Sequence, residues 1–157
     1  AFGTISLRTV HQATEQAIAE GLDFYRSVQG ADGSIGYTAP DGGSPPRNAI
    51  GVVVASLGQQ HDSRLMKGAF AALTLGSETG GGLASSYFFY YLYYAAQAYF
   101  RADMSAWRQW NRSTVADLVA AQNAQGGWDG AHGPAFCTAT ALLAMALNYR
   151  YLPIYER

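Results

Sequence analysis

Two segments of the chain share one pattern of glutamine, glycine and a large apolar residue, and this repeat constrains the fold more than any other feature. The segments are "QGADGSIGY" (29–37) and "QNAQGGWDG" (122–130). Their matching positions are all 93 residues apart: Gln29 and Gln122, Gly33 and Gly126, Ile35 and Trp128. Each segment follows a helical pattern and precedes a second, more apolar one. A separation of this size fits two helix pairs of about 40–47 residues each.

The repeat predicts an all-α chain of six helices, over about 9–28, 47–59, 63–75, 86–101, 105–122 and 136–150. We expect a single domain over 1–157 with helix pairs at about 9–59, 63–101 and 105–150. The middle pair keeps the helix–loop–helix pattern but has lost the glutamine and the large residue. Ser105 is the expected N-cap of the fifth helix.

The two helices of each pair differ in character. The first is amphipathic and the second is almost wholly apolar, which predicts an outer helix that touches solvent and an inner helix that does not. An inner layer enclosed by an outer layer is an α/α toroid. Three pairs form about half of one, so the fold class that we expect is an α/α-toroid segment.

Composition excludes several classes of protein. Hydrophobic residues make up 49% of the chain and charged residues 13%, against about 25% charged in an average domain. The net charge is −1 and Lys and Arg form no run, so nucleic-acid binding is not expected. The apolar window 85–100 is too short and too rich in tyrosine to predict a transmembrane segment. Both a cytoplasmic location and export after removal of a leader fit the sequence.

The second repeat resembles a known motif. Gln122, Gly126 and Trp128 fit the Q-x3-G-x-W core of the QW motif of squalene–hopene and oxidosqualene cyclases. The helix-pair pattern also resembles the β-subunits of protein prenyltransferases. The segments "YYLYYAAQAYF", "WRQWNRSTVADLVAAQNAQGGW" and "TATALLAMALNYRYLPIYER" look like the C-terminal part of bacterial prenyltransferase/squalene-oxidase-repeat proteins of planctomycete type. The resemblance covers the chain from about residue 15 to its end.

The resemblance implies a fold and a structural role for the motif. In the family the glutamine caps helix ends and the tryptophan stacks in the turn between outer helices. We expect the same of Gln122, Gly126 and Trp128, and of Gln29 and Gly33 in the first copy. Stacking of Trp128 on a ligand is the alternative. The reaction is not implied, because the superfamily also includes lyases, cobalamin carriers and complement thioester domains.

The acidic and zinc motifs of these enzymes are missing. Hopene-type cyclases start their reaction with a protonated aspartate in a D-x-D-D motif. No two of the seven aspartates here are adjacent or separated by one residue, so this motif is absent. Prenyltransferases bind zinc with Asp-x-Cys, but Ala135 stands two residues before Cys137. Asp129, His132 and Cys137 are ligand types that suit zinc, with His11 or His61 as a fourth. We favour a polar loop followed by a buried cysteine, and expect no metal and no cofactor.

A ligand site is expected where the loops before the inner helices meet. Aligning these helices places Arg47, Tyr87 and Cys137 at comparable positions in the first turn, with Asn48 next in the first copy. Arg47 would hold a carboxylate or diphosphate there, or else make an ordinary loop contact. The tyrosines at 87, 90, 91 and 94 form a helical stripe. As in cyclases, such a stripe could stabilise carbocations through the faces of its rings; the alternative is core packing. Packing is favoured because the helix is expected to be buried on all sides.

Two classes of function remain. The missing motifs favour a non-catalytic domain that binds a small hydrophobic or isoprenoid ligand, a peptide or a partner at its loop end. The alternative is part of a terpenoid cyclase or prenyl-processing enzyme whose acid lies outside this chain. An open half-ring would expose its inner helices. We therefore expect either self-association or the rest of a longer chain to cover the first and last helix pairs, around "HQATEQAIAE" and "ALNYRYLPIY".

Overall fold

The computed structural model of the chain describes residues 7–75 and 82–149. This part holds six α-helices and a 3-10 turn, η2 (Gly82–Ala84). The helices are α1 (Leu7–Ser27), α2 (Pro45–Leu57), α3 (Arg64–Leu75), α4 (Phe88–Ala102), α5 (Met104–Ala121) and α6 (Pro134–Ala146). The described residues form no strand beyond a single bridge between Gln29 and Ile35. The prediction of an all-helical fold with six helices is confirmed.

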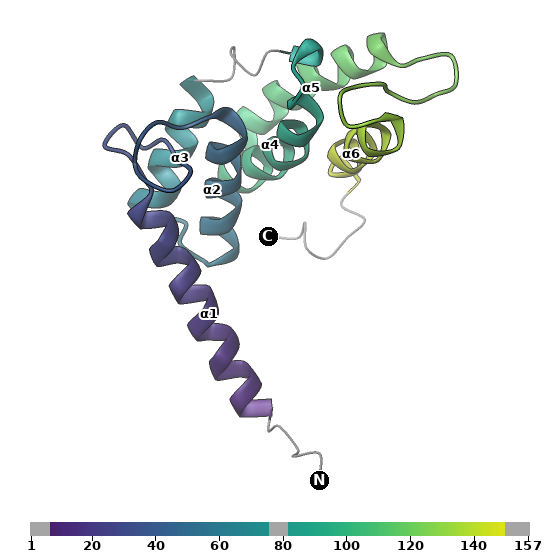
Figure 1. The fold of residues 1–157 in the computed structure, drawn as a ribbon. Helices are drawn as coiled ribbons and strands as arrows, with labels where there is room; N and C mark the ends of the chain where they lie inside the picture. Colours follow the sequence, from purple (N-terminus) through teal and green to yellow (C-terminus); the bar gives the residue numbers. More distant parts are fainter. Residues whose placement is uncertain (1–6, 76–81, 150–157) are drawn as a thin grey trace.

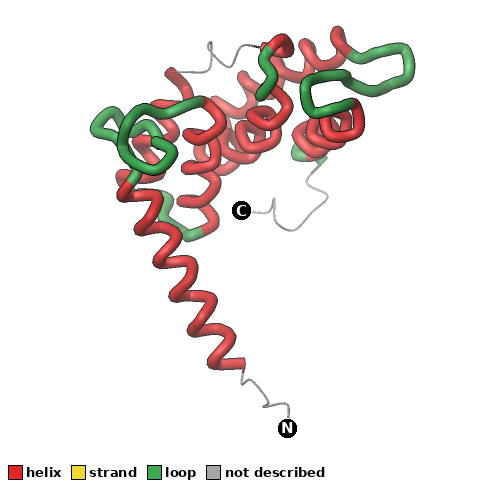
Figure 2. Tube along the Cα trace, in the orientation of Figure 1, coloured by secondary structure: helices red, strands yellow, loops and turns green. Residues whose placement is uncertain are grey.

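The helices form a row with a second layer on it (Figures 1 and 2). Helices α2, α4 and α6 lie side by side, with α4 in the middle. Helix α3 packs on α2, and α5 packs on α4. Each helix of the second layer thus packs on the row helix that precedes it in the sequence. Helix α1 precedes every row helix and projects from the body (Figure 1).

Helix α4 is the centre of the core because it meets helices of the row and of the second layer. Its Tyr99 lies between two rings, edge-on to Phe70 of α3 at 5.6 Å and stacked on Trp110 of α5 at 5.3 Å between ring centroids. Phe100 meets Trp107 of α5 edge-on at 5.2 Å. Both geometries are favourable for aromatic pairs. These aromatic contacts hold α3 and α5 against α4, the middle helix of the row.

The start of α4 is less buried than we expected. Tyr87 stands at the N-cap and its side chain is 62% exposed, and Tyr90 is 37% exposed. Tyr91 is buried. The prediction of a helix buried on all sides is therefore wrong for Tyr87 and Tyr90, although Phe88 and Phe89 between them are buried.

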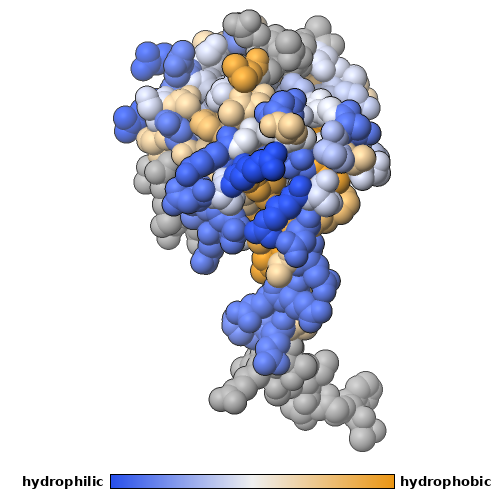
Figure 3. All heavy atoms as spheres, turned by 90° about the vertical axis from the view of Figure 1, so that its left-hand side faces the viewer, coloured by the Kyte–Doolittle hydropathy of each residue, from blue (hydrophilic) through white to orange (hydrophobic). Residues whose placement is uncertain are grey.

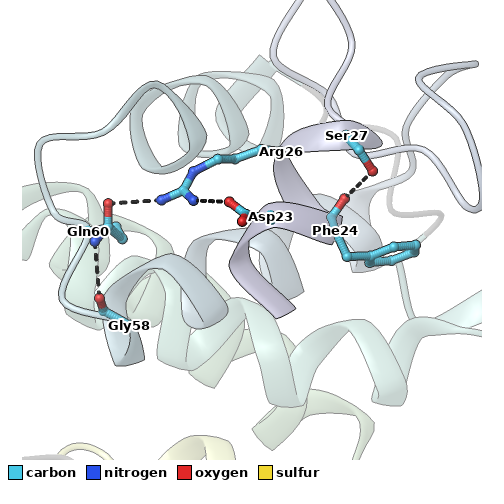
Figure 4. A network of polar contacts seen from close by, with 6 residues as sticks. All are labelled: Asp23, Phe24, Arg26, Ser27, Gly58 and Gln60. Atoms are coloured by element: carbon cyan, nitrogen blue, oxygen red, sulfur yellow. Dashed lines mark hydrogen bonds and ion pairs between the residues drawn. The ribbon is translucent and has the colours of Figure 1, made fainter. Parts of the chain in front are cut away.

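Helix α1 is attached by its last turns. Leu22 is buried against Gly58 in the α2–α3 turn, where a Cβ on the glycine would lie 2.7 Å from it. Arg26 links Asp23 of its own helix to Gln60, which in turn donates to the Gly58 carbonyl (Figure 4). Residues 11–20 are all exposed. The face of α1 seen in Figure 3 is largely hydrophilic, and apolar side chains show where the helix joins the body.

The start of α5 is capped by a residue that the sequence did not single out. The Asp103 carboxylate accepts hydrogen bonds from the Ser105 and Ala106 backbone N–H groups at 2.7 and 2.9 Å. Asp103 is the N-cap, so the prediction of Ser105 is wrong by two residues. A carboxylate at this place satisfies two free N–H groups and complements the helix dipole.

Replacing the cap should lower stability measurably. We expect Asp103→Ala to reduce the free energy of unfolding by about 1 kcal/mol, the usual effect of losing an N-cap. Denaturant unfolding followed by circular dichroism measures it. Ser105→Ala is the matched control and should have little effect, because its backbone N–H, not its hydroxyl, makes the bond. Equal effects of the two substitutions would contradict this assignment.

Candidate functional site

The two glutamine–glycine segments form the same turn. The Gln29 side-chain amide donates to the Gly33 carbonyl at 3.1 Å, and that of Gln122 donates to the Gly126 carbonyl at 2.7 Å. The two glycines have φ of +87° and +82°, a conformation that other residues adopt only with strain. Each turn is therefore closed by one side-chain hydrogen bond and by one glycine in the left-handed conformation.

The large residue of each turn is buried and held by the row helix that follows. Trp128 donates its backbone N–H to the Thr138 hydroxyl at 3.1 Å and its indole N–H to the Leu118 carbonyl at 2.8 Å. In the first turn the Ile35 backbone N–H donates to the Asn48 side-chain oxygen at 2.8 Å. Asn48 is itself buried. Trp128 is only 2% exposed, so its ring is packed inside the protein, as the predicted structural role requires.

Two turn residues were missed by the sequence analysis. Asp32 accepts from both the backbone N–H and the hydroxyl of Ser34. Asn123 accepts from the Gly127 N–H at 2.9 Å and donates to Asp129 at 2.8 Å. The signal was present, since Asp and Asn side chains commonly bond the backbone in turns.

Removing the tryptophan ring should be costly. We expect Trp128→Ala to lower the free energy of unfolding by about 3–5 kcal/mol, because a buried ring and its hydrogen bond are lost together. Equilibrium denaturation measures the change. Trp128→Phe keeps most of the apolar plate and should cost less. A loss below about 1 kcal/mol for the alanine variant would mean that the ring is not packed as described.

The Asp32 contact predicts a pH dependence. The Ser34 hydroxyl, and then its backbone N–H, lower the pKa of Asp32 below its usual value. A carboxyl with a lowered folded-state pKa contributes stability above its unfolded-state pKa, and this contribution is lost as the pH falls through the folded-state pKa. Asp32→Asn should therefore make stability less sensitive to pH below about 4. Thermal melts at stepped pH measure this, with Asp117→Asn as a control for removing one charge. Parallel curves for Asp32→Asn and the wild type would contradict it.

The third loop does not assemble a ligand set. Cys137 is buried in the first turn of α6, where a Cβ on Gly130 would lie 2.9 Å from its sulfur. Burial raises the pKa of the Cys137 thiol, which disfavours the thiolate that zinc requires. Asp129 and His132 are exposed. Within residues 7–75 and 82–149, no three His, Cys, Asp or Glu side chains are grouped as a metal site would need.

A pocket lies where the loops before α2 and α4 meet. Its volume is about 560 Å³. Arg47 at the start of α2 and Tyr87 and Tyr91 at the start of α4 all line it. The rest of the lining consists of Tyr37, Ser44, Pro45, Pro46, Ile50, Ser85 and Tyr90. Beyond the pocket, the Tyr87 ring lies 6.1 Å from that of His132, so the third loop reaches the same end of the row.

The charged group of this pocket is held in place by the loop. Arg47 donates from Nε to the Ile35 carbonyl and from Nη2 to the Gly42 carbonyl, both at 3.0 Å. Two bonds from one planar group fix its orientation. Burial raises the pKa of Tyr91, so its phenol stays protonated at neutral pH. The pocket therefore combines several aromatic rings with one fixed cation.

A second hollow of about 640 Å³ lies between α5 and the end of α6. Its lining includes Arg108, Arg112 and Val115 of α5 and Met145 and Tyr149 from the α6 side. Asn111 and Asn148 bond each other across it at 2.8 Å. None of these residues was a candidate from the sequence.

Comparison with protein-family models, with curated proteins and with solved structures found no match to this chain. Among the described residues, none of the helices combines the length and the apolarity that a membrane span needs.

Proposed function

We propose that this chain is a helix-repeat binding domain that takes a small ligand with an apolar body and an anionic group. The ligand occupies the pocket between the starts of α2 and α4. The observation that carries the proposal is the fixed guanidinium of Arg47 at the edge of an aromatic-lined pocket.

Size and chemistry support such a ligand. A volume of about 560 Å³ is within the range of pockets for small molecules, roughly 300–1,000 Å³. Tyrosine and proline rings and Ile50 suit an apolar body. Arg47 makes no ion pair within the described residues, so its charge is available to a carboxylate or a phosphate.

The lining supports binding rather than catalysis. Its described residues are tyrosines, prolines, serines, an isoleucine and one arginine, and none of these is a carboxylate, a histidine or a thiol. General acid–base chemistry near neutral pH usually depends on one of those groups. The raised pKa of Tyr91 makes its phenol a poor acid there.

The proposed architecture is a segment of an α/α toroid, similar to terpenoid cyclases and prenyltransferases. The row of α2, α4 and α6 with α3 and α5 layered on it supports this. The repeated turns at Gln29 and Gln122 support it as well, since they stand at matching places before two row helices. Isoprenoid diphosphates are one class of ligand that combines an apolar chain with an anion.

Isothermal titration calorimetry with three probes tests the proposal. Dodecanoate and geranyl diphosphate each combine an apolar chain with an anion, and dodecanol lacks the charge. We expect both anions to bind at least about tenfold more tightly than the alcohol, a difference of about 1.4 kcal/mol. Arg47→Met should abolish this preference, so that the anions bind no more tightly than the alcohol.

A matched control locates the site. Arg108 lines the second hollow and not the first, so Arg108→Met removes an equal charge elsewhere. It should leave all three affinities as in the wild type. Binding that Arg108→Met weakens and Arg47→Met does not would overturn the assignment. Binding of none of the three probes would overturn the ligand class.

A further inference from the structure

The second hollow, between α5 and the end of α6, is a groove with two arginines on one edge. Its volume is about 640 Å³. Its lining on α5 runs from Trp107 to Val115, a length of about 12 Å along the helix axis. Arg108 and Arg112 lie one turn apart on this length, and both are exposed. The groove therefore follows α5 for about two turns, and positive charge is repeated along it.

The floor of the groove is apolar. Trp107 is buried, and its ring lies edge-on to Phe100 of α4 at 5.2 Å between centroids, so it is fixed in the core. Val115 and Met145 are half-buried, and Met145 packs against the core. An apolar side chain placed on this floor loses its contact with water, which is favourable. The groove thus combines an apolar floor with a positive edge.

A pair of amides joins the two sides of the groove. Asn111 of α5 donates to Asn148 Oδ1 at 2.8 Å, and Asn148 returns a hydrogen bond of 3.3 Å to Asn111 Oδ1. Asn148 also donates to the Met145 carbonyl at 2.9 Å, near the end of α6. These bonds hold the two sides at a fixed separation, because one of the two amides is also tied to the backbone. The groove is therefore formed before a partner arrives.

Arg108 and Arg112 make no ion pair within residues 7–75 and 82–149, where the ion pairs join other residues. The two acids on or next to α5, Asp103 and Asp117, are each five residues from the nearer arginine. Side chains meet on a helix when they are three or four residues apart, and like charges at that spacing weaken it slightly. Neither arginine lies in the last turn, where the helix dipole favours a cation. The stability of α5 therefore does not explain the two arginines.

These arginines differ from Arg47 in a way that indicates the size of the partner. Two loop carbonyls hold the Arg47 guanidinium, whereas nothing in the described part of the chain holds that of Arg108 or Arg112. A small anion would have to order both long side chains by itself, which costs conformational entropy. Exposed charges at the edge of an interface instead steer and align a large charged partner. For the same reason Arg108→Met is a suitable control for the small probes above.

We propose that this groove docks an acidic amphipathic helix of a partner protein, independently of the pocket between α2 and α4. Acids four residues apart on such a helix are separated by about 6 Å along its axis, the same spacing that Arg108 and Arg112 have along α5. Apolar residues on the adjoining face of the partner helix pack on Trp107, Val115 and Met145. This is the helix-in-groove mode of recognition. The charges set the orientation of the helix, and the floor supplies the burial.

Fluorescence anisotropy with labelled peptides tests the role of charge. The probe is a helical peptide of repeated Glu-Leu-Ala-Ala units, which places glutamates and leucines on adjoining faces. A peptide of repeated Gln-Leu-Ala-Ala units is its neutral counterpart. We expect the acidic peptide to bind at least about tenfold more tightly than the neutral one, with a difference that shrinks as salt is added. Equal affinities, or no binding of either peptide, would overturn the proposal.

Reversing the charges locates the contact. Arg112→Glu should remove the preference for the acidic peptide, and Arg108→Glu combined with it should create a preference for a peptide of repeated Lys-Leu-Ala-Ala units. Lys67→Glu is the matched control for one reversed charge, because Lys67 is exposed on α3 and does not line the groove. It should keep the preference of the wild type. Circular dichroism checks that each variant folds. A preference that survives the double reversal, or that Lys67→Glu removes, would contradict this site.

Two further measurements exclude other occupants. Oligothymidylate carries its charge on phosphates, and binding tighter than that of the acidic peptide would make nucleic acid the partner and overturn the proposal. Glu156→Gln removes an acid of this chain that lies outside the described residues. We expect it to leave the affinity for the acidic peptide unchanged. Tighter binding to this variant would mean that the chain's own acid competes for the arginines, which would rule out a partner protein as the occupant.

Discussion

A loop that buries a large side chain must also bury that residue's backbone N–H, and the structure depends on how this group is satisfied. An unpaired buried N–H costs about 1–3 kcal/mol. In the first turn the partner is Asn48, and in the second it is Thr138. Both acceptors stand near the start of the row helix that follows. One hydrogen bond therefore fixes the loop to the helix start, and the pocket-lining residues on that loop and helix are positioned by it.

Arg47 follows from the same constraint. It adjoins Asn48 in the first turn of α2, and its guanidinium bonds the Ile35 carbonyl while Asn48 bonds the Ile35 N–H. Both backbone groups of one residue are thus held by neighbouring side chains of one helix. The guanidinium is rigid because its two hydrogen bonds to loop carbonyls hold it in place. A side chain that is already ordered loses little conformational entropy when an anion binds to it. Structural and binding roles of Arg47 coincide, so they are separated by comparing ligands of different charge.

Much of the fold was predictable because the repeat and the apolar periodicity are strong local signals. The six helices lie within a few residues of their predicted ends, apart from α6, which ends at Ala146. The N-cap of α5 was misplaced because both Asp103 and Ser105 suit a cap, and local sequence did not choose between them. The exposure of Tyr87 was missed because the helix was expected to begin at residue 86, whereas it begins at Phe88 and leaves Tyr87 at the N-cap. The pocket draws residues from segments around 37–50 and 85–91. The repeat predicted that the loops before these helices meet, but not which of their side chains line a pocket.

The two glutamines show how a repeated motif serves more than its own turn. The Gln29 amide closes its turn and also approaches two carbonyls of α3, while Gln122 closes its turn alone. The hydrogen bond that both glutamines make lies within their own turns. The additional contacts of Gln29, found only in the first copy, join successive helix pairs because α3 belongs to the next pair. A side chain with donors left over after closing its turn can recruit the next helix at no further cost in backbone order. The Gln122 amide is exposed, and its one hydrogen bond among the described residues is the one that closes its own turn.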